Sequence, residues 1–309
     1  MIHVFIVNPM AGKMDFAEKL RRKISEFKDI DYYIFDTRNA GYEGELINRI
    51  QHIFEDEKLR IYCCGGSGTL RNIINDIDNL DNVEVAFLPC GLSNSFIKVF
   101  PAKDQKRFKQ LEELIYGDVV DIDYIRFNNK NIALNSFSMG IDSVLLEQVE
   151  KYRFINTIGN ISPYMWCLPF ALFKSHTIKC EVTIGEKHYV DDFTEIYFGN
   201  GNILGGNVSI YDEANVTDGL GKVVLLRSDA RRFWSIPIVF NLMRKKFYKL
   251  KYIAEYADAQ NIYIRRINDG PIKYNVDGEM LTFGGTVKVE MVKKGLHFVV
   301  PKGVTPSEQ

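Results

Sequence analysis

The sequence has few of the residues that would build a metal centre or a disulfide framework. It contains five cysteines, and no two of them form a C-x-x-C pair. Its five histidines are scattered without the spacing of a metal-ligand set. A zinc knuckle and a disulfide-stapled domain are therefore excluded, and we expect reduced thiols of the kind found in cytoplasmic proteins.

Long hydrophobic runs are absent as well. The longest strongly apolar stretch, residues 164–173, contains Pro169 and is far shorter than the roughly 20 residues that cross a bilayer as a helix. Residues 1–7 lack the basic start of a signal peptide and are typical of a first strand. We therefore expect no transmembrane segment, and any membrane contact should be peripheral.

An excess of charge of either sign is also missing. The 39 Lys and Arg residues nearly balance the 40 Asp and Glu residues, which leaves a formal net charge of -1. This balance gives no reason to expect nucleic acid as a partner.

A chain of 309 residues is longer than a domain with one ordinary hydrophobic core, so two domains are expected. The sequence leaves a homodimer open.

The first 120 residues alternate between strand and helix patterns. Strands are expected at residues 2–7, 31–36, 60–64 and 83–88, and helices at residues 14–26, 42–55 and from 70 to 76. Such alternation predicts a parallel sheet with helices on both faces, whose binding edge lies where the strands end. We expect this α/β domain to span residues 1–122 and to be completed by residues 292–309.

The remaining chain, residues 123–291, is rich in strand patterns separated by Asn, Asp and Gly. It predicts an antiparallel β-sandwich interrupted by one helical stretch at residues 143–174. The expected strands lie at residues 119–127, 130–139, 177–184, 187–199, 221–226, 259–266, 272–276 and 286–291.

Three turns of small residues follow strands of the α/β domain. They are N-P-M-A-G at residues 8–12, G-G-S-G-T at residues 65–69 and P-C-G-L-S-N at residues 89–94. All three fall on the same edge of the predicted sheet. A glycine turn that opens a helix can hold phosphate, because the backbone comes close and the first amides point at the anion. Tight packing of strand on helix would also explain the glycines.

Taken in order, these turns resemble those of the diacylglycerol kinase catalytic family, which includes bacterial soluble lipid kinases and related sphingosine kinases. The family carries N-P-x-x-G, G-G-D-G-T and P-x-G-T-x-N-D turns. Later blocks of the family match N-S-F-S-M-G-I-D at residues 135–142, Gly199 to Gly201, Gly205 with Gly206, D-G-L at residues 218–220 and N-V-D-G-E at residues 275–279. The resemblance covers nearly the whole chain.

The resemblance implies that the first domain binds ATP and that the sandwich helps to bind a lipid acceptor at a membrane surface. Thr37 is a weaker candidate for nucleotide binding, because a turn or helix-capping role explains a threonine at this position equally well. The nucleotide-binding residues implied by the family motifs are Asn8, Pro9, Gly12, Thr37, Gly65, Gly66, Ser67, Gly68, Thr69, Gly91, Ser93 and Asn94.

The D-G-E motif supplies the catalytic candidates. In the family the Asp is the base that accepts the proton of the acceptor hydroxyl and the Glu assists it, roles that fall here on Asp277 and Glu279. A plain hairpin turn is the alternative, because Asp-Gly is also a strong hairpin signal.

A magnesium site is implied for the turn before one of the sandwich strands. By resemblance to the bacterial members, Asp218 gives its carboxylate, and Asn215 and Leu220 give backbone carbonyls. An Asp-Gly turn without metal is the alternative. The expected cofactors are therefore ATP and Mg²⁺.

The chain departs from the family at three positions, where Ser67, Leu92 and Ser95 stand in place of Asp, Thr and Asp. The leading hypothesis is an ATP-dependent lipid kinase. The alternatives are a catalytically weak or inactive relative that binds nucleotide or lipid, and a sugar or NAD kinase, since NAD kinases share the glycine loop.

The basic and aromatic stretch at residues 227–253 suits either an anionic lipid surface or an amphipathic helix packed on the sandwich.

Overall fold

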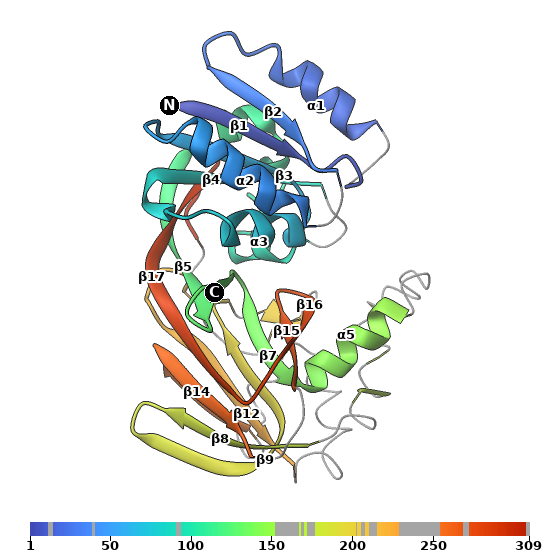
Figure 1. Cartoon of the computed structure of the whole chain (residues 1–309), viewed down its shortest axis with the longest axis vertical. Helices are drawn as coiled ribbons and strands as arrows, with labels where there is room; N and C mark the ends of the chain where they lie inside the picture. Colours follow the sequence, from blue (N-terminus) through green and yellow to red (C-terminus); the bar gives the residue numbers. More distant parts are fainter. Residues whose placement is uncertain are drawn as a thin grey trace. The chain divides into compact units, whose positions relative to one another are not determined.

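The chain folds into two compact units (Figure 1). The N-terminal unit comprises Met1–Tyr124 and Lys293–Ser307, and the C-terminal unit comprises Ile125–Val292. The computed structural model describes residues 1–11, 15–38, 41–90, 94–151, 167, 170–171, 177–201, 203–204, 208–209, 215–228, 254–267 and 272–306.

A parallel sheet forms the centre of the N-terminal unit. Its strand order is β2 (Tyr32–Asp36), β1 (Ile2–Val7), β3 (Leu59–Gly65), β4 (Val83–Pro89) and the last part of β17 (Thr286–Val300). Every residue of β3 and β4 is buried, as expected for strands covered on both faces. The predicted parallel sheet is therefore confirmed.

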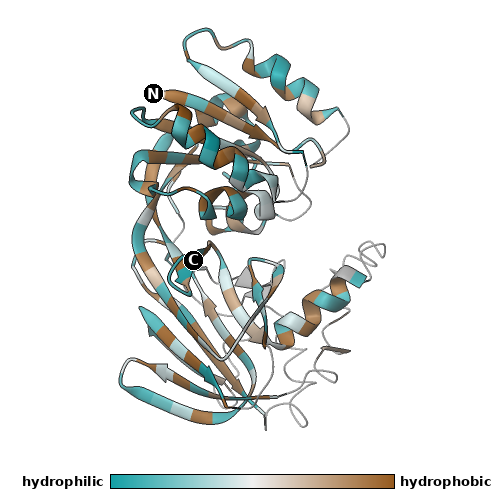
Figure 2. Cartoon of the chain, in the orientation of Figure 1, coloured by the Kyte–Doolittle hydropathy of each residue, from teal (hydrophilic) through white to brown (hydrophobic). Residues whose placement is uncertain are grey.

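The helices of this unit are α1 (Phe16–Ile24), α2 (Tyr42–Ile53), α3 (Ser67–Asn75) and α4 (Leu111–Ile115), with short 3-10 turns at Leu80–Asn82, Ser95–Val99 and Arg107–Lys109. Figure 2 shows α1 as largely hydrophilic, and it buries only Leu20 and Ile24. A group of aromatic rings packs around the end of β17, and its members are Phe96, Phe100, Phe108 and Phe298.

The helix that follows the glycine turn begins earlier than the sequence suggests. The pattern of apolar residues places its start at Leu70, whereas α3 begins at Ser67. Gly66 is the N-cap, and its carbonyl accepts a hydrogen bond of 3.1 Å from the amide of Leu70. The glycine turn therefore forms the first turn of the helix itself.

The C-terminal unit is a β-sandwich of antiparallel pairs, as predicted. Along one path the order is β16 (Glu279–Phe283), β15 (Ile272–Val276), β7 (Ser136–Gly140), β9 (Lys187–Gly199), β8 (Ile178–Ile184), β14 (Asn261–Arg266) and the first part of β17. Further pairs join β12 (Gly221–Arg227) to β9 and β13 (Ala254–Ala259), β5 (Asp118–Phe127) to β6 (Asn131–Ala133), and β10 (Ile203–Leu204) to β11 (Val208–Ser209). One helix, α5 (Ile141–Lys151), follows β7 directly.

Three features of the sandwich differ from the sequence prediction. The expected strand at residues 130–139 is split into β6 and β7, because the backbone between them turns to bond with Asp277. The expected strand at residues 259–266 corresponds to β14, and the strand just before it, β13, which pairs with β12, was not predicted. Strand β16 was not predicted at all.

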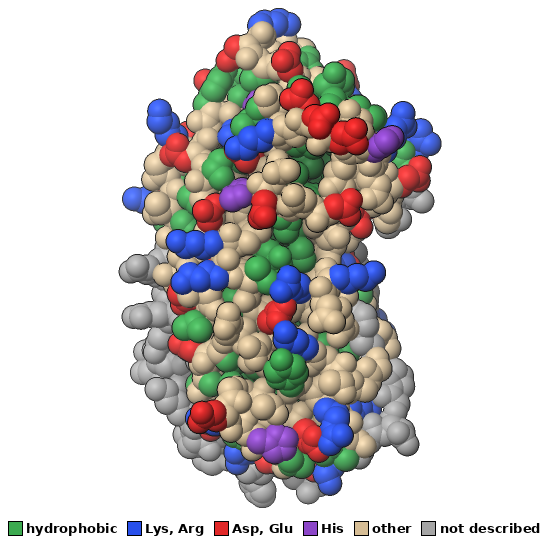
Figure 3. Space-filling model, turned by 60° about the vertical axis from the view of Figure 1, so that its left-hand side comes forward, with side chains coloured by type: hydrophobic (Ala, Val, Ile, Leu, Met, Phe, Trp, Pro, Cys, Tyr) green, Lys and Arg blue, Asp and Glu red, His purple; other side chains and the backbone are tan. Residues whose placement is uncertain are grey.

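Charged side chains of both signs lie on the surface of the described residues. On the face shown in Figure 3, basic and acidic side chains are intermixed, in keeping with the formal net charge of -1. Among the described residues, no helix combines the length and apolar character needed to cross a bilayer. The apolar stretch at residues 164–173 and the basic and aromatic stretch at residues 227–253 lie almost entirely outside the described residues.

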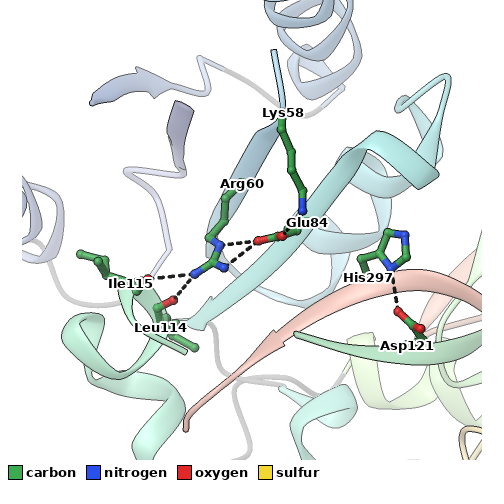
Figure 4. Close-up of polar contacts among 7 residues, drawn as sticks. All are labelled: Lys58, Arg60, Glu84, Leu114, Ile115, Asp121 and His297. Carbon is green, nitrogen blue, oxygen red and sulfur yellow. Dashed lines mark hydrogen bonds and ion pairs between the residues drawn. The ribbon is translucent and has the colours of Figure 1, made fainter. Parts of the chain in front are cut away.

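A buried ion pair ties α4 to the sheet of the N-terminal unit (Figure 4). The guanidinium of Arg60 donates to Glu84 at 2.7 and 2.6 Å and to the carbonyls of Leu114 and Ile115 at 3.2 and 2.8 Å. Lys58 adds a contact of 2.7 Å to the other oxygen of Glu84. The arrangement satisfies a charge pair that would otherwise be costly to bury.

Candidate functional site

The turn after β1 is bonded to the first turn of α3. The side-chain amide of Asn8 donates to the hydroxyl of Thr69 at 3.1 Å, while its carbonyl oxygen accepts from the amide of Met10 at 3.0 Å. The backbone amide of Asn8 donates to Cys64 at the end of β3. Asn8 therefore fixes the shape of its own turn and its distance from α3.

The glycine turn is shaped by close packing at its first residue. A Cβ added at Gly65 would lie 3.0 Å from both the Cβ and the Oγ1 of Thr69. The N-cap of α3, Gly66, makes no side-chain capping bond. The amides of Ser67, Gly68 and Thr69 precede the first bond within the helix, so they are the donors that a helix start presents to an anion.

The turn after β4 joins the same edge. The amide of Cys90 donates to the carbonyl of Gly65 at 2.9 Å, and Asn94 follows as a half-buried residue. Thr37, after β2, is buried, and its amide donates to Val7 at 2.9 Å, which continues the ladder between β2 and β1. The structure thus brings Asn8, Pro9, Thr37, Gly65 to Thr69 and Asn94 to one sheet edge. Gly12, Gly91, Leu92 and Ser93 lie outside the described residues.

The thiols at this edge are neutral. Burial raises the pKa of Cys90 to about 12, although the charge of Lys109 acts in the opposite direction. Burial also raises the pKa values of Cys63 and Cys64 well above the ordinary range. These cysteines therefore add no negative charge that would oppose an anionic ligand.

Arg71 is a largely buried cation of α3. It is 9% exposed within α3, and its guanidinium donates to Asn72 at 3.4 Å. The position of the family aspartate is taken by Ser67, the first residue of the helix.

The D-G-E turn of the C-terminal unit holds Asp277 by its carboxylate. Oδ2 accepts the amide of Leu134 at 2.6 Å, and Oδ1 accepts the amides of Asn135 and Ser136 at 2.8 and 3.0 Å. Asp277 has a left-handed backbone with φ of 52°, and Gly278 follows with φ of 89°. The turn is therefore built around a fixed carboxylate, and Glu279 follows as the first, half-buried residue of β16.

A second group of acidic side chains lies behind this turn and was not predicted from the sequence. Asp142, in the first turn of α5, accepts the Ser138 hydroxyl and the Asn275 side-chain amide, both at 2.6 Å. Glu195 on β9 accepts the backbone amide of Asp142 at 3.0 Å. The motifs at residues 135–142 and 275–279 contain Asp142 and Asn275, but only the fold shows that they touch.

Burial is the main cause of the pKa shifts of these acidic side chains. It raises the pKa of Asp142, against the hydrogen bonds from Ser138 and Asn275, which lower it. It raises the pKa of Glu195 further, and the charge of Asp142 adds to the effect. The pKa of Tyr197 is raised by burial and then by the charges of Asp142, Asp277 and Glu195, so the four groups share one environment.

The turn proposed to hold magnesium lies before β12. Asp218 Oδ1 accepts the amide of Leu220 at 2.8 Å, and Gly219 has a positive φ of 82°. The side-chain oxygen of Asn215 accepts the amide and the hydroxyl of Thr217 at 2.9 and 2.7 Å. The Asp218 carboxylate is a hard oxygen donor of the kind that Mg²⁺ prefers. Among the described residues, no group of three or more His, Cys, Asp or Glu side chains could hold a metal ion.

Comparison with known proteins identifies the family. Residues 3–127 match the model of the diacylglycerol kinase catalytic domain, and residues 135–300 match that of the YegS C-terminal NAD kinase beta sandwich-like domain. A protein of Enterobacter sp. (strain 638) named "Probable lipid kinase YegS-like" is 24% identical to this chain over 297 residues, which cover 94% of each chain. A diacylglycerol kinase of Bacillus subtilis is 21% identical over 300 residues, covering 96% of this chain and 95% of the relative.

Solved structures agree on the fold. Two crystal structures of Bacillus anthracis proteins described as diacylglycerol kinases superpose with TM-scores of 0.74 and 0.69 at 19% and 18% identity. The superpositions cover 96% of this chain and 94% and 96% of those chains. Together, the two matched models and these relatives show that the chain belongs to the diacylglycerol kinase family of lipid kinases.

Proposed function

We propose that this protein is an ATP-dependent kinase that transfers the γ-phosphate to a hydroxyl group of a lipid. The observation that carries the proposal is the start of α3. A helix N-terminus whose N-cap residue, Gly66, makes no side-chain capping bond follows directly on a buried strand. The turn after β1 is hydrogen-bonded to the first turn of this helix, and the turn after β4 is hydrogen-bonded to Gly65 at the end of the strand. Such a site binds the anionic tail of a nucleotide through backbone amides and the helix dipole.

The residues of the N-terminal unit bind and orient the nucleotide. The amides of Ser67, Gly68 and Thr69 donate to phosphate oxygens, and Asn8 keeps Thr69 in place for this contact. Neutral thiols at Cys64 and Cys90 leave the electrostatic field of the helix start unopposed. Ser67 itself donates a hydroxyl to a phosphate oxygen, where a carboxylate would need a cation between itself and the phosphate.

Asp277 orients the acceptor hydroxyl and accepts its proton, and Glu279 assists. The three amides that bind the Asp277 carboxylate set its direction, which matters because phosphoryl transfer depends mainly on positioning and charge stabilisation. Mg²⁺ brought with ATP supplies charge neutralisation at the phosphates. Asp218, with the carbonyls of Asn215 and Leu220, would hold a second, structural Mg²⁺.

The acceptor is a lipid that the enzyme reaches from a membrane surface. The protein would therefore act in the cytoplasm with a peripheral membrane contact, and the lipid-kinase relatives support this substrate class. Sedimentation with vesicles that contain diacylglycerol and anionic phospholipid would measure the contact. No binding at low ionic strength would contradict it.

The test is transfer of labelled phosphate from ATP to diacylglycerol in mixed micelles, with Mg²⁺ and with Mn²⁺. We expect transfer by the unmodified protein and a loss of roughly 10²–10³-fold in kcat for Asp277→Asn, with little change in the KM for ATP. Ser67→Asp tests the glycine turn, and we expect it to increase the rate if the family carboxylate improves metal placement. Binding of ATP in calorimetry without any transfer would favour a nucleotide-binding relative instead.

A further inference from the structure

Behind the D-G-E turn, Asn275 forms hydrogen bonds at both ends of its side chain. Its amide nitrogen donates to Asp142 at 2.6 Å, and its oxygen accepts the backbone amide of Gly278 at 2.9 Å. The side chain is only 6% exposed. It therefore links the residue after Asp277 to a carboxylate on another element, 133 positions away in the sequence.

Asp142 is in turn held by its surroundings. It is 2% exposed, and the Ser138 hydroxyl donates to the same oxygen, Oδ2, that accepts Asn275. Its backbone amide donates to Glu195, which is 9% exposed on β9. Four elements, β7, α5, β9 and β15, thus meet in one hydrogen-bonded group.

A glycine, Gly140, allows the start of α5 to lie close to β9. Gly140 ends β7 with φ of 120°, and a Cβ there would lie 2.1 Å from the carbonyl oxygen of Thr194. Any other residue would push the start of α5 away from β9. The contact between Asp142 and Glu195 therefore depends on Gly140.

We infer that Asp142 is a positioning residue for Asp277, acting through Asn275. The inference rests on the proposed function of Asp277 as the residue that orients the acceptor hydroxyl. Asn275 and the amides of Leu134, Asn135 and Ser136 hold the turn from two sides, and Asp142 fixes the orientation of Asn275. We name the group of Ser138, Asp142, Glu195 and Asn275 the carboxylate relay.

Turn formation alone does not explain the carboxylate relay. An Asp-Gly hairpin forms readily without buried partners, because Asp and Gly tolerate the backbone angles. Burying carboxyl groups is unfavourable unless they are well hydrogen-bonded. A costly group that bonds to the turn at Gly278 is explained by the need to hold the Asp277 carboxylate in one orientation.

The test exchanges the side chains of Asp142 and Asn275. Asn275→Asp brings two carboxylates together, and we expect kcat to fall about 100-fold with the KM for ATP within about twofold. The double variant Asp142→Asn with Asn275→Asp restores a donor–acceptor pair with its polarity reversed, and the oxygen introduced at position 275 still accepts the amide of Gly278. We expect it to recover to within about fivefold of the unmodified protein.

A second readout does not depend on activity. Hydrogen–deuterium exchange of the peptides that contain residues 134–136 and 272–283 should become about tenfold faster in Asn275→Asp and return toward normal in the double variant. Glu181→Ala, which removes the partner of the exposed Arg265 in the same unit, is the control and should change neither readout. Asp142→Ala should behave like Asn275→Asp.

These measurements separate failure of the relay from failure of the proposed function. If the unmodified protein transfers no phosphate but the exchange pattern is as expected, the kinase proposal fails and the positioning contact stands. If the double variant is no better than Asn275→Asp in exchange, and in kcat where there is activity, the positioning role of Asp142 is wrong.

Discussion

The side-chain amide of Asn8 lies 3.1 Å from the hydroxyl of Thr69, and this bond joins the turn after β1 to the first turn of α3. The two residues are 61 positions apart in the sequence. Their contact makes two of the three small-residue turns at the sheet edge into one surface. Binding of a nucleotide at this edge should therefore depend on the contact between the turns as well as on each turn.

Removal of the bond should weaken nucleotide binding. We expect Asn8→Ala to raise the Kd for ATP in the presence of Mg²⁺ about tenfold, because one hydrogen bond and the order of the turn are lost. Isothermal titration calorimetry measures the change. Asn79→Ala is the matched control, since Asn79 accepts one backbone amide, from Asp81, before the start of β4. An equal loss in both variants would show a general effect on the unit.

Gly65→Ala tests the close packing of the glycine turn. The added methyl group would lie 3.0 Å from the side chain of Thr69, so Thr69 and the amides around it must shift. We expect the Kd for ATP to rise roughly 10- to 50-fold, corresponding to about 1.4–2.3 kcal/mol. Thermal unfolding measures how far the same overpacking, at the last residue of the buried strand β3, also lowers the stability of the unit.

Gly284→Ala is the control for that substitution. No atom lies within 4 Å of a Cβ added there, and the residue does not have a positive φ. We expect its ATP affinity to match that of the unmodified protein. Normal affinity in Gly65→Ala would mean that the packing against Thr69 does not contribute to the nucleotide site.

The N-terminal sheet could be predicted from the sequence because each strand carries its own signal. Residues 2–7 form a short apolar run, which is what a strand covered on both faces requires, and β1 has those bounds. The start of α3 was placed three residues late. Glycines weaken a helix pattern. The helix starts with the hydrogen bond from the amide of Leu70 to the carbonyl of Gly66, and the spacing of apolar residues does not indicate this bond.

The carboxylate relay could not be predicted, because it depends on contacts across the sandwich. Asp142 and Asn275 each belong to a recognised motif, yet their separation of 133 residues hides the contact. The break between β6 and β7 has the same origin, since the amides at that break bond to Asp277, more than 140 positions away. Local patterns contain no information about such pairs.

Glu84→Gln should destabilise the N-terminal unit. Lys58 and Arg60 hold the pKa of Glu84 below its ordinary value, although burial alone would raise it. Arg60 is 7% exposed, so loss of its charged partner leaves a buried cation without full compensation. We expect a cost of about 3 kcal/mol, seen as a fall in Tm of about 8 °C by circular dichroism.

An exposed pair provides the control for Glu84→Gln. Glu181 contacts Arg265 at 2.6 Å, but the arginine side chain is 62% exposed. We expect Glu181→Gln to change Tm by less than about 2 °C, because solvent screens the pair. Equal shifts in the two variants would refute a special contribution from the buried pair.

His3 should make the N-terminal unit sensitive to acid. Burial, followed by the charge of Arg60, lowers the pKa of His3 to about 4. The Tyr62 phenol remains protonated because burial raises its pKa, and its oxygen lies 2.8 Å from Nδ1 of His3, within hydrogen-bond distance. The neutral imidazole is therefore the form that fits the fold.

The sign of the effect follows from proton counts. Between the unfolded pKa of about 6.5 and the folded value of about 4, the unfolded chain binds more protons at His3. Stability is thus fully present above pH 6.5 and is lost as the pH falls through 4. Allowing for partial solvent screening, we expect His3 to account for about 2 kcal/mol of the loss between pH 7 and pH 4.5.

Urea unfolding at both pH values measures this contribution. His3→Gln should lose about 2 kcal/mol less than the unmodified protein on acidification, because the introduced amide does not titrate. His52→Gln, at an exposed position in the last turn of α2, should retain the full loss. If His3→Gln has the same pH dependence as the unmodified protein, other groups cause the acid sensitivity, and the contact between His3 and Tyr62 is not its source.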